Sequence, residues 1–153
     1  MLTSKQLSIG RIALNTEGGL ITRLFLPGEA PPAPPPAAGT LPDLAFTQLE
    51  EYLAGTRKHF QLPLATPQGT PLQQDIMQRI CTIPYGHTAT YGSMGPARVV
   101  GSVCAGNPLP ILRPCHRVLP AQHPPGHYRG GKALKHLLLT LETGQRHLMP
   151  VPG

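Results

Sequence analysis

Residues 106–120 read GNPLPILRPCHRVLP, and this stretch decides how the second half of the chain is interpreted. It places Cys115 beside His116, with Arg113 and Arg117 on either side. A cysteine becomes a nucleophile when an imidazole, a cation or a helix N-terminus lowers its pKa below the reference value of about 8.5. The same residue types also suit half of a metal site, or a small buried cysteine beside a loop histidine. From the residues alone, these alternatives stay open.

A histidine that acts as a base usually needs a third group to fix its tautomer. Glu142 is the only acidic residue after Asp75, and it lies beside an apolar helical pattern. Cys115, His116 and Glu142 therefore form a candidate catalytic triad. A carboxylate in the last turn of a helix is unfavourable to the helix dipole, so we expect another group to compensate Glu142.

Metal binding is the competing interpretation of the same region. Residues of types that ligate metals are present at six positions: Cys104, Cys115, His116, His123, His127 and His136. None of them forms a CxxC pair, the spacing that is typical of a metal site. We therefore predict no metal site and no cofactor.

Composition and charge limit the class of protein. The chain has 153 residues, 40% of them hydrophobic, with 17 Gly and 20 Pro, which predicts a globular protein of short elements and many turns. A net charge of +6 and a pI near 9.7 favour a nucleic-acid partner, although a solvated basic surface would look the same. Three cysteines without disulfide spacing, and no apolar run of the ~20 residues that a membrane span needs, predict a cytoplasmic protein, on the nucleoid if the source is a bacterium. Nothing in the sequence demands more than a monomer.

The first half of the chain predicts a small mixed domain. A hairpin is expected over residues 8–26, because NTEGG supplies the positive φ angles of a tight turn. A Pro-rich loop follows over 27–42, then an amphipathic helix over 43–55 with Asp43 as its N-cap, and a short strand over 59–64.

The second half predicts three helices, which we place in a separate domain after a boundary near residues 65–69. Thr70 and Pro71 are typical of a helix start, and the short helix 97–105 should bury its valines and expose Arg98. A last helix over 132–142 should end at Gly144. The expected apolar positions of the first and last helices are Leu72, Ile76, Ile80, Ile83, Leu134, Leu137, Leu138 and Leu141.

These segments together resemble the O6-alkylguanine-DNA alkyltransferases, also called methylated-DNA–protein-cysteine methyltransferases. GNPLPILRPCHRVLP and GHYRGGKALKHLLLTLE (126–142) resemble their active-site region, and ARVVGSVCAGNP (97–108) resembles their recognition helix. PLQQDIMQRICTIPYGHTATYG (71–92) resembles the preceding helix and Tyr-Gly connector, and QLEEYLAGTRKHFQLPL (48–64) the end of the N-terminal domain. The resemblance covers most of the chain from about residue 43.

The resemblance implies an α+β fold with two domains. Residues 1–66 would form a small N-terminal α/β, ribonuclease-H-like domain with a β-hairpin sheet and a helix. Residues 67–153 would form a mainly helical, winged-helix-like domain that binds DNA and carries the active site.

It also implies a reaction. Cys115 would take the alkyl group from O6-alkylguanine in double-stranded DNA, once per molecule, with O4-alkylthymine as a second candidate substrate. His116 would draw the thiol proton through a water, Glu142 would orient His116, and Asn107 would brace the active-site turn. The damaged base would first be flipped out of the helix.

Further roles are implied for the base and the DNA. Tyr91 would hydrogen-bond the purine, Tyr128 would stack on it, and the backbone N–H of Arg129 would donate to O6. The carbonyls of Cys115 and Val118 would read its exocyclic amine. Arg98 would fill the vacated stack. Lys135 would lie near the pocket. The size of the pocket would depend on Pro110, Arg129 and Gly130. Ala97 and Ser102 would contact the DNA together with Arg98 and Tyr91.

Two departures from the family pattern stand out. Only GSMGPA separates Tyr91 from Arg98, so most of the first helix of the helix-turn-helix is missing, and Arg113 stands where an aliphatic residue is usual. A lesion sensor that binds alkylated DNA without efficient transfer is therefore the second hypothesis. The presence of Cys115 favours the enzyme, and a metal-binding regulator is a distant third.

Overall fold

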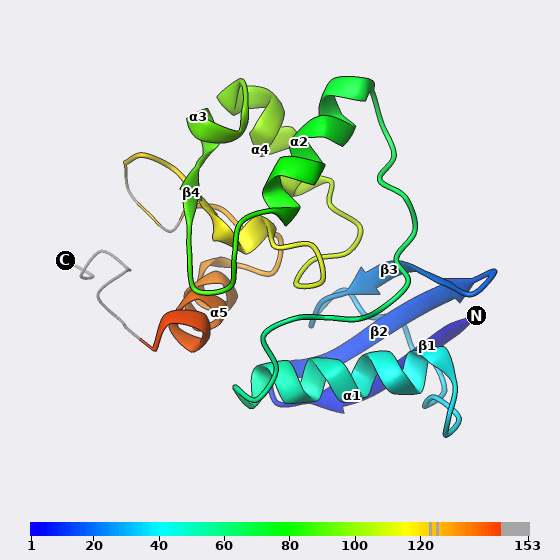
Figure 1. The fold of residues 1–153 in the computed structure, drawn as a ribbon. Coiled ribbons are helices and arrows are strands. Elements are labelled where there is room, and N and C mark those ends of the chain that lie inside the picture. The colour runs from blue at the N-terminus through cyan, green and yellow to red at the C-terminus, as the bar shows by residue number, and fades with distance from the viewer. Residues whose placement is uncertain (123, 125, 145–153) are drawn as a thin grey trace. The chain divides into compact units, whose positions relative to one another are not determined.

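The structure is a computed structural model that describes residues 1–122, 124 and 126–144. The chain separates into two compact units, Met1–Thr66 and Pro67–Gly153. The first combines a three-stranded antiparallel sheet with one helix and the second is mainly helical, which confirms the predicted α+β class (Figure 1). None of the helices in the described ranges combines the length and the apolar character that crossing a membrane requires.

The sheet of the first unit has the strand order β1-β2-β3, with bounds Leu2–Leu7, Gly10–Glu17 and Leu20–Phe25. Gly18 and Gly19 join β2 to β3 at φ angles of 56° and 78°, the positive values that a two-residue hairpin turn requires. The predicted hairpin is thus confirmed. Strand β1 escaped prediction because two of its buried positions are the polar Thr3 and Ser4 rather than apolar residues.

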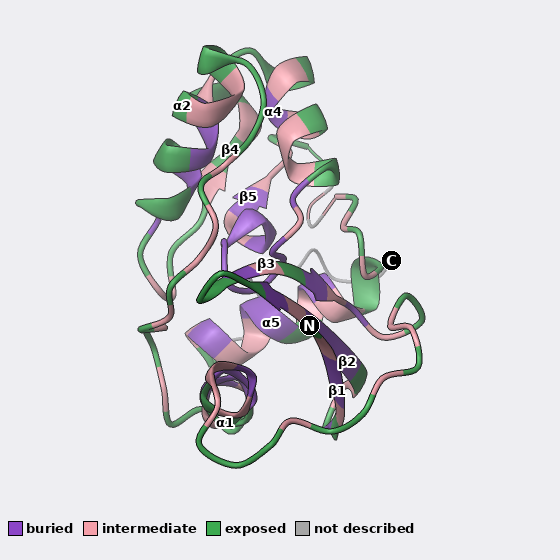
Figure 2. Cartoon of the chain, turned by 90° about the vertical axis from the view of Figure 1, so that its right-hand side faces the viewer, coloured by how far each residue is buried: buried purple, intermediate pink, exposed green. Residues whose placement is uncertain are grey.

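Helix α1 (Leu41–Leu53) packs on β1 and β2 through its buried face (Figures 1 and 2). The prediction that Asp43 is its N-cap is wrong, because the helix begins earlier, after Thr40. The Asp43 carboxylate instead accepts a hydrogen bond from the Gly39 N–H at 3.0 Å. The strand predicted over 59–64 is also wrong: only Leu64 pairs, in a single bridge to Ile21.

The Pro-rich loop has no regular structure before α1, as predicted. Its backbone is nevertheless attached to β1, because the Ser4 N–H donates to the carbonyl of Pro34 at 2.9 Å. The Ser4 hydroxyl donates to the carbonyl of Ala33 at 2.6 Å. A proline-rich segment has few donors of its own, so the edge strand supplies them.

Helix α2 (Pro71–Cys81) opens the second unit with a complete capping box between Thr70 and Gln73. The Gln73 N–H donates to the Thr70 hydroxyl at 3.2 Å, and the Thr70 N–H donates to Gln73 Oε1 at 2.9 Å. The predicted cap is confirmed, and Ile76 and Ile80 are buried as expected. Leu72 is exposed, contrary to prediction, because it lies in the first turn beyond the packed part of the helix.

The chain then forms a set of short elements that meet around one apolar cluster. These are β4 (Ala89–Thr90), α3 (Tyr91–Met94), α4 (Ala97–Ala105), the 3-10 turn η1 (Cys115–Arg117) and β5 (Val118–Leu119). β4 pairs in parallel with β5, so the Tyr-Gly connector is hydrogen-bonded to the segment that follows Cys115. α3 is a single turn of four residues, at the place where the family resemblance implies the first helix of a helix-turn-helix.

Helix α5 (Lys132–Thr143) ends at Gly144, whose φ of 67° is the left-handed cap that the sequence predicts. Its buried face differs from the predicted leucine stripe. Leu138 is buried, but Leu137 is exposed, and the buried positions are Lys135, Leu138, Leu139 and Glu142. The inward face of α5 therefore carries two ionisable groups.

Candidate active site

Cys115 lies in η1, only 3% exposed, and Asn107 holds the turn around it. The Asn107 side-chain amide donates to Cys115 Sγ at 3.2 Å and to the Arg113 carbonyl at 3.1 Å. Its carbonyl oxygen accepts from the Leu109 N–H at 3.0 Å. One buried amide therefore satisfies the backbone at both ends of the turn and also touches the sulfur.

The same turn contains the one non-glycine residue at positive φ in the described ranges, Ile111 at 73°. A β-branched side chain is strongly disfavoured there. Ile111 is buried, and the Arg113 N–H donates to the Leu109 carbonyl at 2.8 Å across it. The bonds of Asn107 and Arg113 thus hold the turn in a strained shape, as happens at functional sites.

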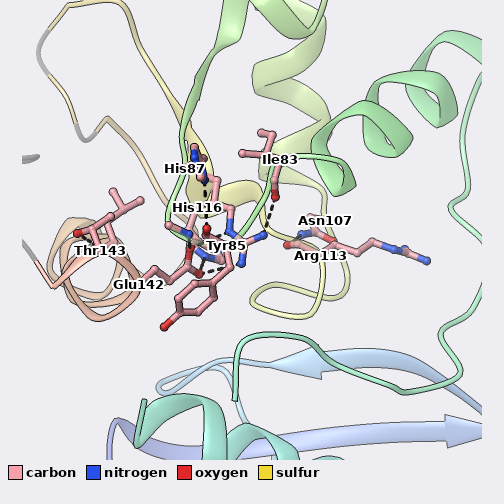
Figure 3. A network of polar contacts seen from close by, with 11 residues as sticks. Ile83, Tyr85, His87, Asn107, Arg113, His116, Glu142 and Thr143 are labelled. Carbon is pink, nitrogen blue, oxygen red and sulfur yellow. Dashed lines mark hydrogen bonds and ion pairs between the residues drawn. The ribbon is translucent and has the colours of Figure 1, made fainter. Parts of the chain in front are cut away.

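His116 and Glu142 form a fully buried pair, with His116 Nε2 and Glu142 Oε2 separated by 2.6 Å (Figure 3). Because the carboxylate also accepts from Arg117, Nε2 must be the donor, which leaves the lone pair of a neutral ring on Nδ1. Burial lowers the pKa of His116 despite the attraction of Glu142, so the ring is neutral near pH 7. Nδ1 is buried and has no hydrogen-bond partner among the described residues.

Arg117 compensates the charge of Glu142. Its Nε donates to Oε1 at 2.8 Å and its Nη2 to Oε2 at 3.1 Å, while Nη1 donates to the Ile83 carbonyl at 2.7 Å. The Gly86 N–H adds a bond to Glu142 Oε1 at 3.3 Å. The sequence predicts that another group compensates the charge of Glu142, but it does not identify Arg117 as that group. The position of Arg117 directly after His116 was the sequence feature that could have indicated it.

The Cys115 thiol is not pre-ionised. Its hydrogen bond with the Cys104 thiol and its burial raise the pKa of Cys115 well above the ordinary value. The same bond lowers the pKa of Cys104, which lies on α4. Cys115 therefore needs a base at the moment it reacts, and Cys104 is a neighbour that the sequence gave no reason to place there.

A cavity of about 230 Å³ lies over Cys115. Its lining residues are Tyr91, Gly101, Cys104, Ala105, Cys115, His127, Tyr128 and Arg129. A wider groove of about 620 Å³ adjoins it and shares Tyr91, Gly101, Ala105 and His127. Tyr91, Tyr128 and Arg129 thus line the cavity, whereas the other residues expected at the base are not among its lining residues: Pro110, Val118, Gly130 and Lys135.

Lys135 is buried behind the cavity and not in it. Its Nζ donates to the Val118 carbonyl at 2.8 Å and to the His127 carbonyl at 3.3 Å, and lies 5.9 Å from the centre of the Tyr91 ring. Burial lowers the pKa of Lys135 to about 8. The Cys115 carbonyl accepts from the Val118 N–H. Each carbonyl expected to read the base therefore already accepts one bond, and one lone pair of each is left.

The exposed side of α4 carries Ala97, Arg98 and Ser102, while Val100 is buried and Val99 and Val103 are half-buried, as the sequence predicts. The short α3 is tied to α2, because Arg79 Nη1 donates to the Met94 carbonyl at 2.8 Å. This bond supports the turn before α4 where most of a helix is missing.

Arg113 is buried next to Asn107 (Figure 3), and both residues line a separate cavity of about 370 Å³. No group of three or more His, Cys, Asp or Glu side chains that could hold a metal ion occurs in the part of the chain described; His123, one of the candidate ligands, lies outside it.

A short helix with an exposed arginine accompanies a buried cysteine and a histidine that can act as a base, which suits a protein that binds DNA and accepts a group on a thiol. Residues 71–144 match the family model described as 6-O-methylguanine DNA methyltransferase, DNA binding domain. The chain belongs to the methylated-DNA–protein-cysteine methyltransferases, because relatives of that name are 36–37% identical to it over 90–92% of its length.

Three of these relatives are similar over nearly their whole length. The constitutive methylated-DNA–protein-cysteine methyltransferase of Bacillus subtilis is 37% identical, over 92% of this chain and 93% of the relative. The Mycobacterium leprae enzyme of that name is 36% identical, over 90% and 88%. The crystal structure of Mycobacterium tuberculosis OGT in complex with DNA superposes with a TM-score of 0.81 at 33% identity, covering 94% and 92% of the two chains.

Proposed function

We propose that this protein repairs DNA by transferring the alkyl group of O6-alkylguanine, and of O4-alkylthymine as a second substrate, to Cys115 in a single turnover. The observation that carries the proposal is the buried chain Arg117–Glu142–His116 beside Cys115. It fixes a neutral imidazole with its acceptor nitrogen unpaired, next to a thiol that is protonated at rest. A neutral imidazole in this position can act as a general base that takes the thiol proton when the substrate is bound.

The transfer needs no cofactor. Cys115 gives its proton to His116 Nδ1 through a water as its sulfur attacks the alkyl carbon. The S–C bond forms, the C–O6 bond breaks, and the electron pair stays on guanine O6. Glu142, which Arg117 holds in place, stabilises the imidazolium that results. The thioether product has no easy route to hydrolysis, so each molecule acts once.

The cavity residues have matching roles toward the departing base. Burial raises the pKa of Tyr91, so its hydroxyl stays protonated and can donate to the purine. Tyr128 supplies a ring for stacking, and the Arg129 N–H donates to O6 as charge develops there. The Cys115 and Val118 carbonyls use their remaining lone pairs for the exocyclic amine, while Arg129, which lines the cavity, limits the size of the alkyl group.

Reaching this cavity requires a flipped nucleotide. Arg98, Ala97 and Ser102 on α4 face the duplex, and Arg98 fills the space that the base leaves. An O6-alkyl group weakens pairing, so extrusion costs less for damaged than for normal guanine. The acting species is a monomer on duplex DNA in the cytoplasm; sedimentation of the complex tests its stoichiometry.

Intact-mass analysis after incubation with a duplex that contains O6-methylguanine tests the proposal, with Cys115→Ala as the matched control. We expect one methyl adduct per molecule, mapped to Cys115, and none in the variant. Duplex binding by the folded, reduced protein without an adduct would overturn it in favour of the lesion sensor.

A further inference from the structure

Two of the three cysteines meet in the cavity that would receive the alkyl group. Cys104 lies in the last turn of α4 and Cys115 begins η1, and both side chains line the 230 Å³ cavity. Cys104 packs against the apolar cluster that contains Cys115, and the interaction of the two thiols lowers the pKa of Cys104 and raises that of Cys115. The third, Cys81 at the end of α2, is exposed and does not line this cavity.

We propose that Cys104 and Cys115 are a redox pair that closes to a reversible disulfide bond when the protein meets a peroxide. The bond itself is independent of the proposed function. Its consequence rests on that function, because a sulfur held in a disulfide cannot accept an alkyl group. Oxidation would therefore inactivate Cys115 reversibly, and reduction would restore it as the acceptor.

The two thiols are unequal in the way this chemistry needs. Cys104 is half-buried, and its interaction with Cys115 and the charge of Lys135 lower its pKa. Cys115 is buried and remains a thiol. Since the thiolate is the form that peroxides oxidise, Cys104 reacts first.

The steps balance with hydrogen peroxide as the oxidant. The Cys104 thiolate attacks one peroxide oxygen, the O–O bond breaks, and the hydroxide that leaves takes a proton to become water. The resulting sulfenic acid is then attacked by Cys115, whose proton goes to His116. The S–S bond forms, the S–O bond breaks, and the hydroxide leaves with that proton as a second water. Two thiols are oxidised while one peroxide is reduced to two waters.

The surroundings favour closure over irreversible oxidation. Two thiols that line one small cavity must approach each other to reach the bonded S–S distance of about 2.05 Å. Cys104 is in the last turn of α4, two residues before Gly106. Local unfolding costs less free energy at the end of a helix than in its middle. Without a neighbouring thiol, an oxidised Cys115 would have no partner to resolve its sulfenic acid before further oxidation.

The first experiment measures the bond. Reduced full-length protein is titrated with hydrogen peroxide, quenched with N-ethylmaleimide and mapped as non-reduced peptides. We expect a Cys104–Cys115 cross-link, one maleimide on Cys81, and full reversal by dithiothreitol. Cys81→Ser should behave the same, and Cys104→Ser should give no intramolecular cross-link. A cross-link that involves Cys81, or a Cys115 that over-oxidises at the same peroxide dose in wild type and Cys104→Ser, would overturn the proposal.

The second experiment links the bond to repair. Oxidised wild type should take no methyl group from an O6-methylguanine duplex, and dithiothreitol should restore acceptance to the level of Cys81→Ser. Reduced protein that takes no methyl group although the cross-link forms would overturn the proposed function and leave the redox pair intact. Normal methyl transfer with no cross-link at any dose would remove the redox pair alone.

Discussion

Arg117 and Glu142, 25 residues apart in the chain, meet in a two-point ion pair with N···O distances of 2.8 and 3.1 Å. The Glu142 side chain is 1% exposed and that of Arg117 11%. Such a pair is favourable only when its remaining atoms are bonded, and here His116, Gly86 and Ile83 complete the set. The pair therefore joins η1 to α5 and fixes the base of the site.

Glu142→Gln should lower both stability and transfer. It leaves the Arg117 charge without its counter-ion, which costs about 3–5 kcal/mol in buried sites, and removes the charge that stabilises His116 during transfer, for a loss on the order of 100-fold in rate. Denaturant unfolding and single-turnover transfer measure the two effects.

The matched control is Glu50→Gln, since Glu50 pairs with Lys5 at 2.7 Å but on the surface. It should cost less than about 1 kcal/mol. Equal losses in the two variants would contradict the role of burial.

Acid should destabilise the protein through His116. Burial holds its folded pKa below the unfolded value of about 6.5, so between these two values the unfolded chain binds more protons. The stability that neutral His116 contributes is therefore present above pH 6.5 and declines as the pH falls below it. Unfolding curves of the wild type and of His116→Gln between pH 5 and 7.5 should converge toward acid; parallel curves would show that folding leaves the pKa of His116 unchanged.

Lys135→Met should reveal a pH dependence of stability in the alkaline range. With a folded pKa of about 8 against an ordinary 10.5, the unfolded chain binds more protons between these values, so the stability of the wild type relative to the variant should rise from pH 8 to 10.5. At neutral pH the variant loses the bond to the Val118 carbonyl, a cost of about 1–3 kcal/mol. Thermal unfolding across this range measures both, and a pH-independent difference would be evidence against the lowered pKa.

Arg98→Ala should affect transfer from duplex DNA far more than transfer from a free O6-alkylguanine base. The side chain is exposed on α4 and takes no part in the buried network, so it matters only when a duplex must be opened. Competition between the two substrates, followed by mass, separates these effects. Arg23→Ala, which removes an equal charge beside Phe25 in the sheet, is the control and should change neither.

The positions that sequence reasoning placed correctly are those with local signals. Thr70 with Gln73, Gly18 with Gly19, and Gly144 each act within a few residues, and a cap or turn is visible there without knowing the fold. What escaped depends on contacts between distant segments. Arg117 with Glu142, Cys104 with Cys115, and Lys135 with Val118 meet only after the chain has folded, so no local pattern announces them.

Helix α5 shows this limit best. Its leucines favour a stripe through Leu134 and Leu141, yet the structure turns the helix by one position so that Lys135 and Glu142 face inward. Hydrophobic periodicity could not find this face because hydrogen-bonded ionisable groups, which such patterns count as exposed, outweigh the difference between neighbouring leucines.

Lys135 and Glu142 are seven residues apart, two helical turns, or about 10.5 Å along one side of α5. One end of this interval holds the carbonyl that would read the base, and the other holds the histidine that would take the proton. The helix is thus a spacer of fixed length between recognition and chemistry. Inserting one residue between them would rotate one end by about 100° against the other and uncouple the two tasks, whereas its outward-facing residues can vary freely without altering that spacing.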